Sequence, residues 1–412
     1  MIVLSLTACS AQEEGAEAAG SWVGTITTEG NVTTVVNESG SVWGGAARLV
    51  EEASIGVDAG EDAYMLGRVL GVVASADRIY VLDSQIPTVR AYDLAGSHVM
   101  DIGGPGGGPG EFDGPDYLSI GPDGAIYVRT GVQGRLTIFE PDGRLRDTWR
   151  YEGPTMSGRP TLVTDAGAVY LPGYVSADGD PATRRSALIR AGADGADSAD
   201  GETIMEPESE GPAGQLVAQG DGPTLRMPVP FAPQMEWAVA TSGAIIAGTS
   251  DDYSFEIRRP GGAVTRVRKG WEPVAVAADE IEWERQQVFE VMRRFYPDWA
   301  WAGPEISTAK PAFVELQVDR DGRVWVYRGG PSAYNPACDD PEPPRGTDCW
   351  IAETIVDVFD PDGRYLGVVD MPAALGRFPP PFIRGDMVVG VVEDEVGTIM
   401  VKRYRLVLPE EE

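Results

Sequence analysis

The stretch that decides the fold is residues 118–149, LSIGPDGAIYVRTGVQGRLTIFEPDGRLRDTW. It predicts an alternating strand, a Pro-Asp-Gly turn, a second strand at 126–129, a third at 136–139, another Pro-Asp-Gly turn and a fourth strand. Asp-Gly between alternating apolar runs is a strong hairpin signal, because glycine tolerates the positive φ that such turns need. Four antiparallel strands in series make one blade of a β-propeller.

The same phrase recurs in eroded form along the chain. The second strands of the copies are predicted at 77–81, 126–129, 166–171, 242–247, 321–326 and 396–401, which indicates six blades. In the last copy the third strand is predicted at Tyr404 to Leu406, and the chain then ends. We expect the N-terminal segment 31–42 (NVTTVVNESGSV) to supply the missing fourth strand, because such a closure removes the open sheet edges that invite aggregation.

One segment carries a resemblance to a known family. Residues 103–128, GGPGGGPGEFDGPDYLSIGPDGAIYV, resemble the G-x-G-x-GPGEF-x-x-P…DG-x-IYV pattern of NHL-type repeats. From about Trp22 onward the chain is similar to bacterial six-bladed β-propeller lipoproteins, and residues 310–328 (KPAFVELQVDRDGRVWVYR) fit that group. The resemblance implies an all-β, six-bladed propeller of four-stranded antiparallel blades over residues 21–408. It is weak for function, since relatives include ligand binders, scaffolds, lyases and lactonases.

The N-terminus resembles a lipoprotein signal. The residues LTAC at 6–9 resemble the bacterial lipobox, in which the cysteine, here Cys9, is lipidated. No Lys or Arg precedes it, so we expect the signal to begin upstream. Residues 11–20 (AQEEGAEAAG) are small and acidic, which makes 1–20 a signal remnant and flexible tether. This predicts a lipid-anchored protein of the cell envelope, periplasmic or on the outer membrane or cell surface; the alternative is an apolar tail with a free thiol.

Two further cysteines, Cys338 and Cys349, bracket the polar loop CDDPEPPRGTDC. With Cys9 assigned to the lipid, they can pair with no thiol left over. A disulfide closing so short a loop would stabilise the fold by about 3 kcal/mol in the loop-entropy model, and it needs an oxidising compartment. A metal site is the alternative, although two thiols without histidine are too few ligands for structural zinc.

Two insertions are predicted outside the repeats. Residues 278–296 form a helix between the fourth and fifth blades, with Ile281, Phe289, Met292 and Phe295 near one face. We expect it to pack on the propeller and cover apolar surface; the alternative is a lid over the channel. Residues 194–222 are acidic and glycine-rich and are expected to form a mobile surface loop.

Composition excludes several classes of site. The formal net charge of -31 argues against binding nucleic acid. The chain has one histidine, His98, so a Ser-His-Asp triad or a multi-histidine metal site is not expected. Asp319 with Asp321 and Asp360 with Asp362 are paired acids, but neither pair belongs to a full calcium loop, so both are interpreted as turns. We therefore expect no cofactor; calcium in a central channel is the alternative.

Ligands of a propeller gather at the channel mouth, on the loops between second and third strands and between blades. This geometry selects eight candidate ligand-binding residues: Asp83, Gln85, Tyr117, Arg129, Thr249, Asp251, Tyr253 and Arg328. The two arginines could hold a carboxylate or sulfate and the tyrosines could stack a ring, unless all of them pair with neighbouring blades.

The lack of a recognisable catalytic constellation favours a monomeric, non-enzymatic binding or scaffolding module, with a small molecule or a protein at the channel face. The alternative is a calcium-assisted lyase or lactonase that uses the central channel.

Overall fold

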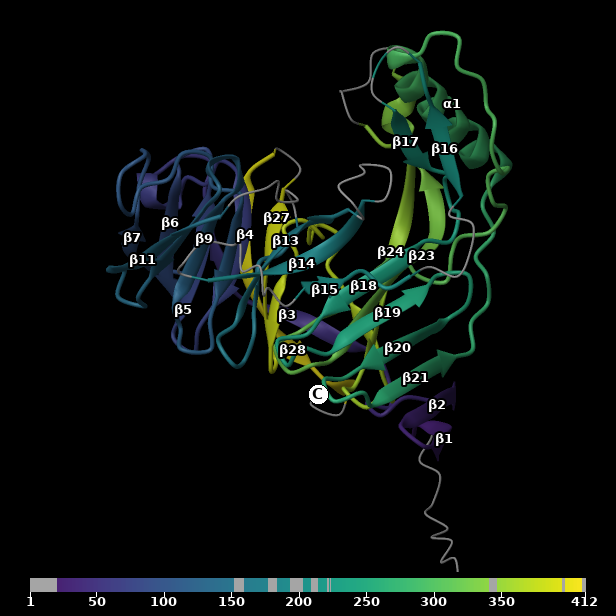
Figure 1. Ribbon diagram of the computed structural model, residues 1–412, viewed down its shortest axis with the longest axis horizontal. Coiled ribbons are helices and arrows are strands. Elements are labelled where there is room, and N and C mark those ends of the chain that lie inside the picture. The colour runs from purple at the N-terminus through teal and green to yellow at the C-terminus, as the bar shows by residue number, and fades with distance from the viewer. Residues whose placement is uncertain are drawn as a thin grey trace, which may run out of the picture.

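The structure is a computed structural model that describes residues 21–151, 159–176, 184–192, 203–208, 214–220, 222, 224–340, 347–394 and 397–409. Most of its regular structure is β-strand, and the described residues contain one α-helix. Four-stranded antiparallel sheets follow one another along the chain (Figure 1), which is the construction of a β-propeller. The all-β class predicted from the sequence is confirmed.

We number sets of four strands as units in chain order, and each of the first three units is a separate sheet of four consecutive strands. Unit 1 comprises β4 (Val69–Ala74), β5 (Arg78–Asp83), β6 (Thr88–Asp93) and β7 (His98–Ile102). Unit 2 comprises β8 (Tyr117–Ile120), β9 (Ile126–Thr130), β10 (Arg135–Phe139) and β11 (Leu145–Arg150). Unit 3 comprises β12 (Leu162–Val163), β13 (Val169–Val175), β14 (Arg185–Ala191) and β15 (Thr203–Met205).

The remaining units draw on both ends of the chain. Unit 4 comprises β18 (Met235–Val239), β19 (Ile245–Thr249), β20 (Ser254–Arg258) and β21 (Val264–Lys269), extended by β2 (Val32–Ser39) and β1 (Val23–Glu29). Unit 5 comprises β22 (Glu315–Val318), β23 (Val324–Tyr334), β24 (Trp350–Phe359) and β25 (Tyr365–Asp370). Unit 6 comprises β26 (Phe382–Arg384), β27 (Met387–Glu393), β28 (Ile399–Val407) and β3 (Ala47–Ile55). A short parallel pairing of β3 with β25 joins units 5 and 6 into one eight-stranded sheet.

Local turn chemistry explains why the units repeat. The Pro-Asp-Gly turns of unit 2 place Gly124 and Gly143 at φ of 81° and 84°, a conformation that only glycine adopts without strain. The first strand, β8, is buried along its whole length, as expected for an inner strand covered on both faces. The predicted second strands of the first five copies coincide with β5, β9, β13, β19 and β23.

Unit 6 differs from the prediction in two ways. Of the segment predicted as its second strand, residues 397–401 are described; they lie in the turn before β28 and at its start. Tyr404 to Leu406, predicted as its third strand, lie in the same strand, because the turn at Gly397 joins β27 to β28. The fourth strand does come from the N-terminal part of the chain, but it is β3 rather than residues 31–42: β3 pairs antiparallel with β28. The segment at 31–42 forms β2, which pairs parallel with β21 of unit 4.

Asn37 fixes β2 between two units. Its side chain, 4% exposed, accepts hydrogen bonds from Trp22 Nε1 (2.7 Å) and the backbone nitrogen of Tyr365 (2.8 Å). Its amide donates to the carbonyls of Arg268 and Gly363, both at 3.1 Å. Every hydrogen-bonding atom of the amide is used, so a buried polar residue joins β2 to units 4 and 5.

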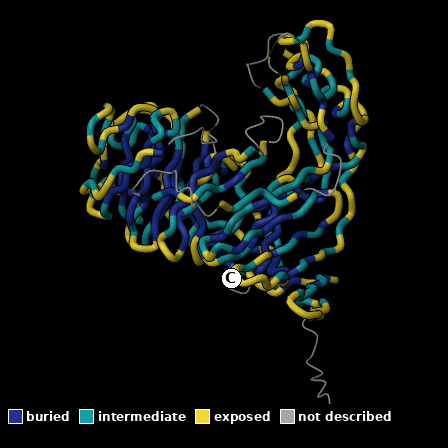
Figure 2. The backbone as a smooth tube through the Cα atoms, viewed as in Figure 1, coloured by how far each residue is buried: buried dark blue, intermediate teal, exposed yellow. Residues whose placement is uncertain are grey.

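Hydrophobic cores lie between neighbouring units rather than within them. Separate clusters join units 6, 1 and 2, units 2 and 3, units 4 and 5, and units 5 and 6. Figure 2 shows the buried backbone concentrated in these sheets. Each sheet therefore buries its faces against the next one, as the stacked blades of a propeller do.

A projection rises from the sheets at the upper right of Figure 1. It contains α1 (Ala278–Phe295) and the hairpin of β16 (Gln215–Ala218) and β17 (Leu225–Pro228). They share one core, whose buried members are Leu216, Ala218, Val229, Val288, Met292 and Ile306. The predicted helix is confirmed. Its apolar side packs on this hairpin, and it meets unit 5 through Glu280, whose Oε1 accepts from the hydroxyl of Ser332 on β23 at 2.7 Å.

The prediction of a mobile loop over 194–222 is wrong for two segments. β15 is the outer strand of unit 3 and β16 belongs to the projection. Residues 193–202, 209–213 and 221 lie outside the described residues, as do Cys9 and the predicted tether at 1–20.

Candidate functional site

A central cavity of about 490 Å³ is the candidate site. The first strands of all six units line it: β4, β8, β12, β18, β22 and β26. Most of its walls are apolar, with side chains that include Val72, Leu118, Trp237, Leu316 and Phe382. This volume and lining are typical of sites for small organic ligands.

Four charged residues gather where the first strands begin, at a position that we call the mouth. Glu236 and Glu315 stand at the start of β18 and β22, and Arg159 and Arg377 shortly precede β12 and β26. Arg377 Nη1 lies 3.8 Å from Glu315 Oε2. Gln317 Nε2 donates a hydrogen bond of 2.6 Å to Glu315 Oε1.

The carboxyl group of Glu236 has an altered proton affinity. Its pKa is raised from 4.5 to about 7: burial is the main cause, the charges of Glu315 and Glu206 contribute, and Arg159 and Arg377 oppose the rise. Near neutral pH the group is therefore present in both protonation states. It can accept or donate a hydrogen bond to a ligand in the cavity.

Arg320 lies at the opposite end, between this cavity and a second one of about 620 Å³. Its side chain and Phe382 line both cavities. Arg320 Nη2 donates to the carbonyl of Ile120 at 3.0 Å, and the guanidinium carbon lies 5.6 Å from the centre of the Phe382 ring. We call this position the floor. The second cavity has a more polar lining, which includes Asp77, Asp123, Asp142, Asp165, Asp321, Arg78 and Arg384.

Of the eight candidates from the sequence, Tyr117 lines the central cavity. Arg129 lies behind it, with its guanidinium carbon 5.4 Å from the centre of the Tyr117 ring. Arg129 is fully buried and donates from Nε to Asp116 Oδ1 and from Nη1 to the carbonyl of Arg159, both at 2.9 Å. Burial raises the pKa of the Tyr117 phenol well above its ordinary value.

Tyr253 and Arg328 come together, but around a buried carboxylate rather than in the cavity. Asp357 Oδ2 accepts from Tyr253 Oη at 2.6 Å and from Arg328 Nε at 2.8 Å, while Oδ1 accepts from Tyr365 Oη at 2.7 Å. Lys269 Nζ lies 4.6 Å from the centre of the Tyr365 ring. This cluster joins units 4 and 5.

The hydrogen bonds of Asp83 stay within unit 1 and the residues that lead into it. Its buried carboxylate accepts hydrogen bonds from the backbone nitrogens of Gly67, Arg68 and Gln85, at 3.0, 3.1 and 2.9 Å, and pairs with Arg90 Nη1 at 3.2 Å.

Three other candidates lie apart. The side chain of Gln85, in the turn after β5, packs against Gly67, which precedes β4. Thr249 ends β19 and Asp251 is exposed in the turn that follows. None of Asp83, Gln85, Thr249 and Asp251 lines the central cavity.

Sequence reasoning missed Glu236 and Arg320. Glu236 is an acid within the otherwise apolar strand MEWAV, and Arg320 sits in a DRDG turn that the turn explanation already accounted for. A charged residue at either end of a predicted innermost strand is the signal that could have found them, because that strand faces the channel.

The paired acids that suggested calcium are engaged by protein groups. Asp319 Oδ1 accepts from the backbone nitrogens of Asp321 and Arg323, and its Oδ2 accepts from Trp325 Nε1. Asp360 Oδ1 accepts from the backbone nitrogens of Asp362 and Arg364. Within the described part of the chain, no group of three or more His, Cys, Asp or Glu residues is arranged to hold a metal ion.

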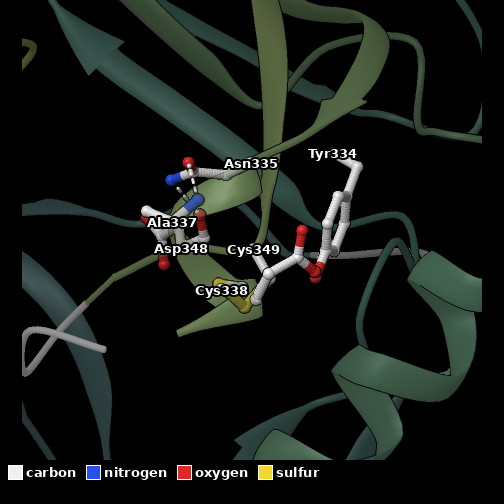
Figure 3. Close-up of a disulfide and its surroundings, with 7 residues drawn as sticks. Tyr334, Asn335, Ala337, Cys338, Asp348 and Cys349 are labelled. Atoms are coloured by element: carbon white, nitrogen blue, oxygen red, sulfur yellow. Dashed lines mark hydrogen bonds between the residues drawn. A yellow bond between two sulfur atoms is a disulfide. The ribbon is translucent and has the colours of Figure 1, made fainter. Parts of the chain in front are cut away.

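The predicted disulfide is confirmed. Cys338 and Cys349 are bonded, with Cα atoms 5.6 Å apart, between the second and third strands of unit 5 (Figure 3). Asn335 flanks the bridge: its Oδ1 accepts from the backbone nitrogen of Ala337 at 3.1 Å and its Nδ2 donates to the carbonyl of Asp348 at 3.0 Å. The bridge therefore closes a loop whose base is already hydrogen-bonded.

No family model matches the chain, and neither does any curated protein. Solved structures do: a member of the DUF4221 family from Bacteroides vulgatus is 11% identical, with a TM-score of 0.51, over 88% of this chain and 98% of that one. A protein from Bacteroides fragilis, thought to be exported, is 12% identical over 91% and 99%, with a TM-score of 0.45. Virginiamycin B lyase from Staphylococcus aureus is 9% identical over 82% and 95%, with a TM-score of 0.37. At such identities the first match supports a shared fold. Among the described helices, none has the length and apolarity to cross a membrane.

Proposed function

We propose that this chain is a six-bladed β-propeller that binds a small organic ligand in its central cavity without transforming it. Six four-stranded units and the cavity lined by all their first strands support six blades around one channel. Cores join five of the six neighbouring pairs of units. Units 3 and 4 meet through a hydrogen bond from the backbone nitrogen of Asp165 to the carbonyl of Thr241, at 2.9 Å.

We also propose that the protein is exported and held in the cell envelope by a lipid on Cys9. The disulfide supports this location, because such bonds persist in oxidising compartments. The lipobox-like LTAC sequence supports the anchor. In this arrangement the binding module acts as a monomer, with its ligand or a partner protein at the channel face.

The observation that carries the binding function is the central cavity itself. It is large enough for a drug-sized molecule, apolar on its walls and charged at its two ends. An apolar channel with arginines offers van der Waals contact and a few orienting groups. Among the described residues that line this cavity, the carboxylates are Glu236, Glu315 and Asp319, and the last two are already engaged by Arg377 and Arg323. The aspartates of the second cavity, on the far side of Arg320, are the group that the lyase or lactonase alternative would use.

A fluorescent apolar probe tests this function on the full chain. N-phenyl-1-naphthylamine should bind the wild type saturably at one site, with enhanced emission. Ala238 lines the cavity, so Ala238→Trp should fill it and abolish binding, whereas Val99→Trp on β7, at a position 45% exposed, should not. Absence of binding to the wild type, or equal binding by both variants, would refute the proposal.

One observation favours the enzymatic alternative: a carboxyl group with a pKa of about 7, Glu236, can transfer a proton at neutral pH. A calcium-assisted lyase or lactonase would also need the ion. Melting curves with Ca²⁺ and with EDTA separate the two functions, because stabilisation by Ca²⁺ that EDTA reverses would favour the enzyme. The binding module is expected to melt at the same temperature in both.

A further inference from the structure

The floor of the central cavity carries a positive charge that forms no ion pair with any described carboxylate. Arg320 donates one hydrogen bond from its guanidinium, to the carbonyl of Ile120, and stacks near Phe382. In the described part of the chain, its other N–H groups have no acceptor and its guanidinium forms no ion pair. A guanidinium stays protonated in proteins, so this charge is present at every physiological pH.

Burial makes the missing counter-ion costly. Desolvation lowers the pKa of Arg320, and the charge of Asp165 opposes that effect without contacting the group. A partly desolvated cation is stabilised strongly by an anion that reaches it, because screening by water and salt is weak there.

The charge of Arg320 is unusual in this molecule, because the chain as a whole is acidic and the neighbouring Arg323 is paired with a carboxylate. The chain has 33 basic and 64 acidic residues, and other arginines near the site are already engaged, such as Arg323 with Asp319 at 2.6 Å. At the mouth, Arg159 and Arg377 stand beside Glu236 and Glu315, so an entering anion meets charges of both signs. At the floor, Asp319 is already paired with Arg323, and the aspartates near Arg320 line the second cavity on its far side. On the side of the central cavity, the floor therefore offers an anion the unpaired guanidinium of Arg320.

We infer that the ligand of the central cavity is an organic acid, with an apolar body against the walls and a carboxylate on Arg320. This inference rests on the proposed binding function and specifies its ligand class. The planar fork of the remaining N–H groups matches a carboxylate in two parallel hydrogen bonds. The walls of Val72, Leu118, Trp237 and Leu316 take the apolar part.

Two probes of the same shape test the anchor on the full chain. 1-Naphthoate carries a carboxylate and 1-naphthamide carries a neutral amide; both are titrated by displacement of N-phenyl-1-naphthylamine. The wild type should bind the naphthoate at least about tenfold more tightly, a factor that corresponds to about 1.4 kcal/mol. The preference should persist in 0.5 M NaCl, because a buried ion pair is screened less than a surface one.

Three variants identify the residue that gives the preference. Arg320→Met should bring the naphthoate-to-naphthamide preference to about one while the neutral probe still binds. Arg320→Lys keeps the charge without the fork and should lower the preference about threefold, which also tests the anchor if the methionine variant does not fold. Arg144→Met is the control, because the Arg144 side chain is 69% exposed, and it should leave the preference unchanged.

The outcomes separate this inference from the proposed function. If the neutral probe binds but naphthoate and naphthamide bind equally, the carboxylate anchor is wrong and the binding function stands. If the preference survives in the folded Arg320→Met or is unchanged in Arg320→Lys, the anchor lies elsewhere and the inference is again overturned. If the wild type binds none of the three probes, both are wrong.

Discussion

Glu236→Gln should stabilise the protein near neutral pH. Burial among the mouth charges raises the pKa of this carboxyl from 4.5 to about 7, so the folded state holds its proton more tightly than the unfolded chain does. The free energy of unfolding contributed by the group is then fully present below about pH 4.5 and is lost as pH rises through about 7. Glutamine keeps the size and polarity of the protonated acid and carries no charge to lose.

The magnitude follows from the change in pKa. Each tenfold change in proton affinity is worth about 1.4 kcal/mol, so a pKa raised from 4.5 to about 7 sets an upper limit of roughly 3 kcal/mol. Glu236 is only half-buried and two arginines lie nearby, so water and counter-charges reduce the cost. We expect Glu236→Gln to raise the free energy of unfolding by about 1–2 kcal/mol at pH 8 and by little at pH 4.5.

Urea denaturation at a series of pH values measures this difference. Other groups also titrate, so the quantity compared is the wild type minus the variant at each pH. Glu290→Gln, at an exposed position on α1, is the matched control and should show no pH-dependent difference. A Glu236→Gln variant that is less stable than the wild type at pH 8, or whose advantage does not grow between pH 4.5 and 8, would refute the reasoning.

Three further predictions concern the contacts that hold the units together, each measured by urea denaturation. Asn37→Ala should cost about 2–4 kcal/mol, because it leaves several buried partners unsatisfied; a loss below 1 kcal/mol would contradict the role of this side chain. Asp357→Ala should cost about 3–5 kcal/mol by leaving half-buried Arg328 and two tyrosine hydroxyls without their acceptor, and an unchanged midpoint would exclude that pairing. Replacing Cys338 and Cys349 together by serine should cost about 3 kcal/mol; equal midpoints for oxidised wild type and double variant would show that the bridge does not stabilise the fold.

The strands of units 1 to 5 could be predicted because their signals are local. An Asp-Gly turn between alternating runs determines a hairpin from a few residues, as at Gly124 and Gly143. The segment that supplies the fourth strand of unit 6 could not be identified from a local signal. Residues 31–42 and the segment that forms β3 both have strand character, and only pairing with β21 or β28 distinguishes them.

The candidate site was harder to predict for a similar reason. Arg129 and Arg328 were placed near the loops that the topology indicated, but their carboxylate partners, Asp116 and Asp357, depend on register across the sheet and on packing between units. Glu236 and Arg320 face the cavity from positions whose local pattern a strand and a turn already explain. Which carboxylate pairs with which arginine depends on how the sheets are arranged in space, and the local sequence pattern does not indicate that arrangement.

The pairing of β3 with β28 has a consequence for the timing of folding. Lys402 Nζ and Glu51 Oε2, 2.8 Å apart on these strands, are separated by 351 residues, so unit 6 is completed only after almost the whole chain has been synthesised. Such long-range pairing makes folding slow. We propose that this chain is exported from the cytoplasm. The delay then means that the polypeptide crosses the membrane before unit 6 is complete, and that its last sheet is assembled on the far side.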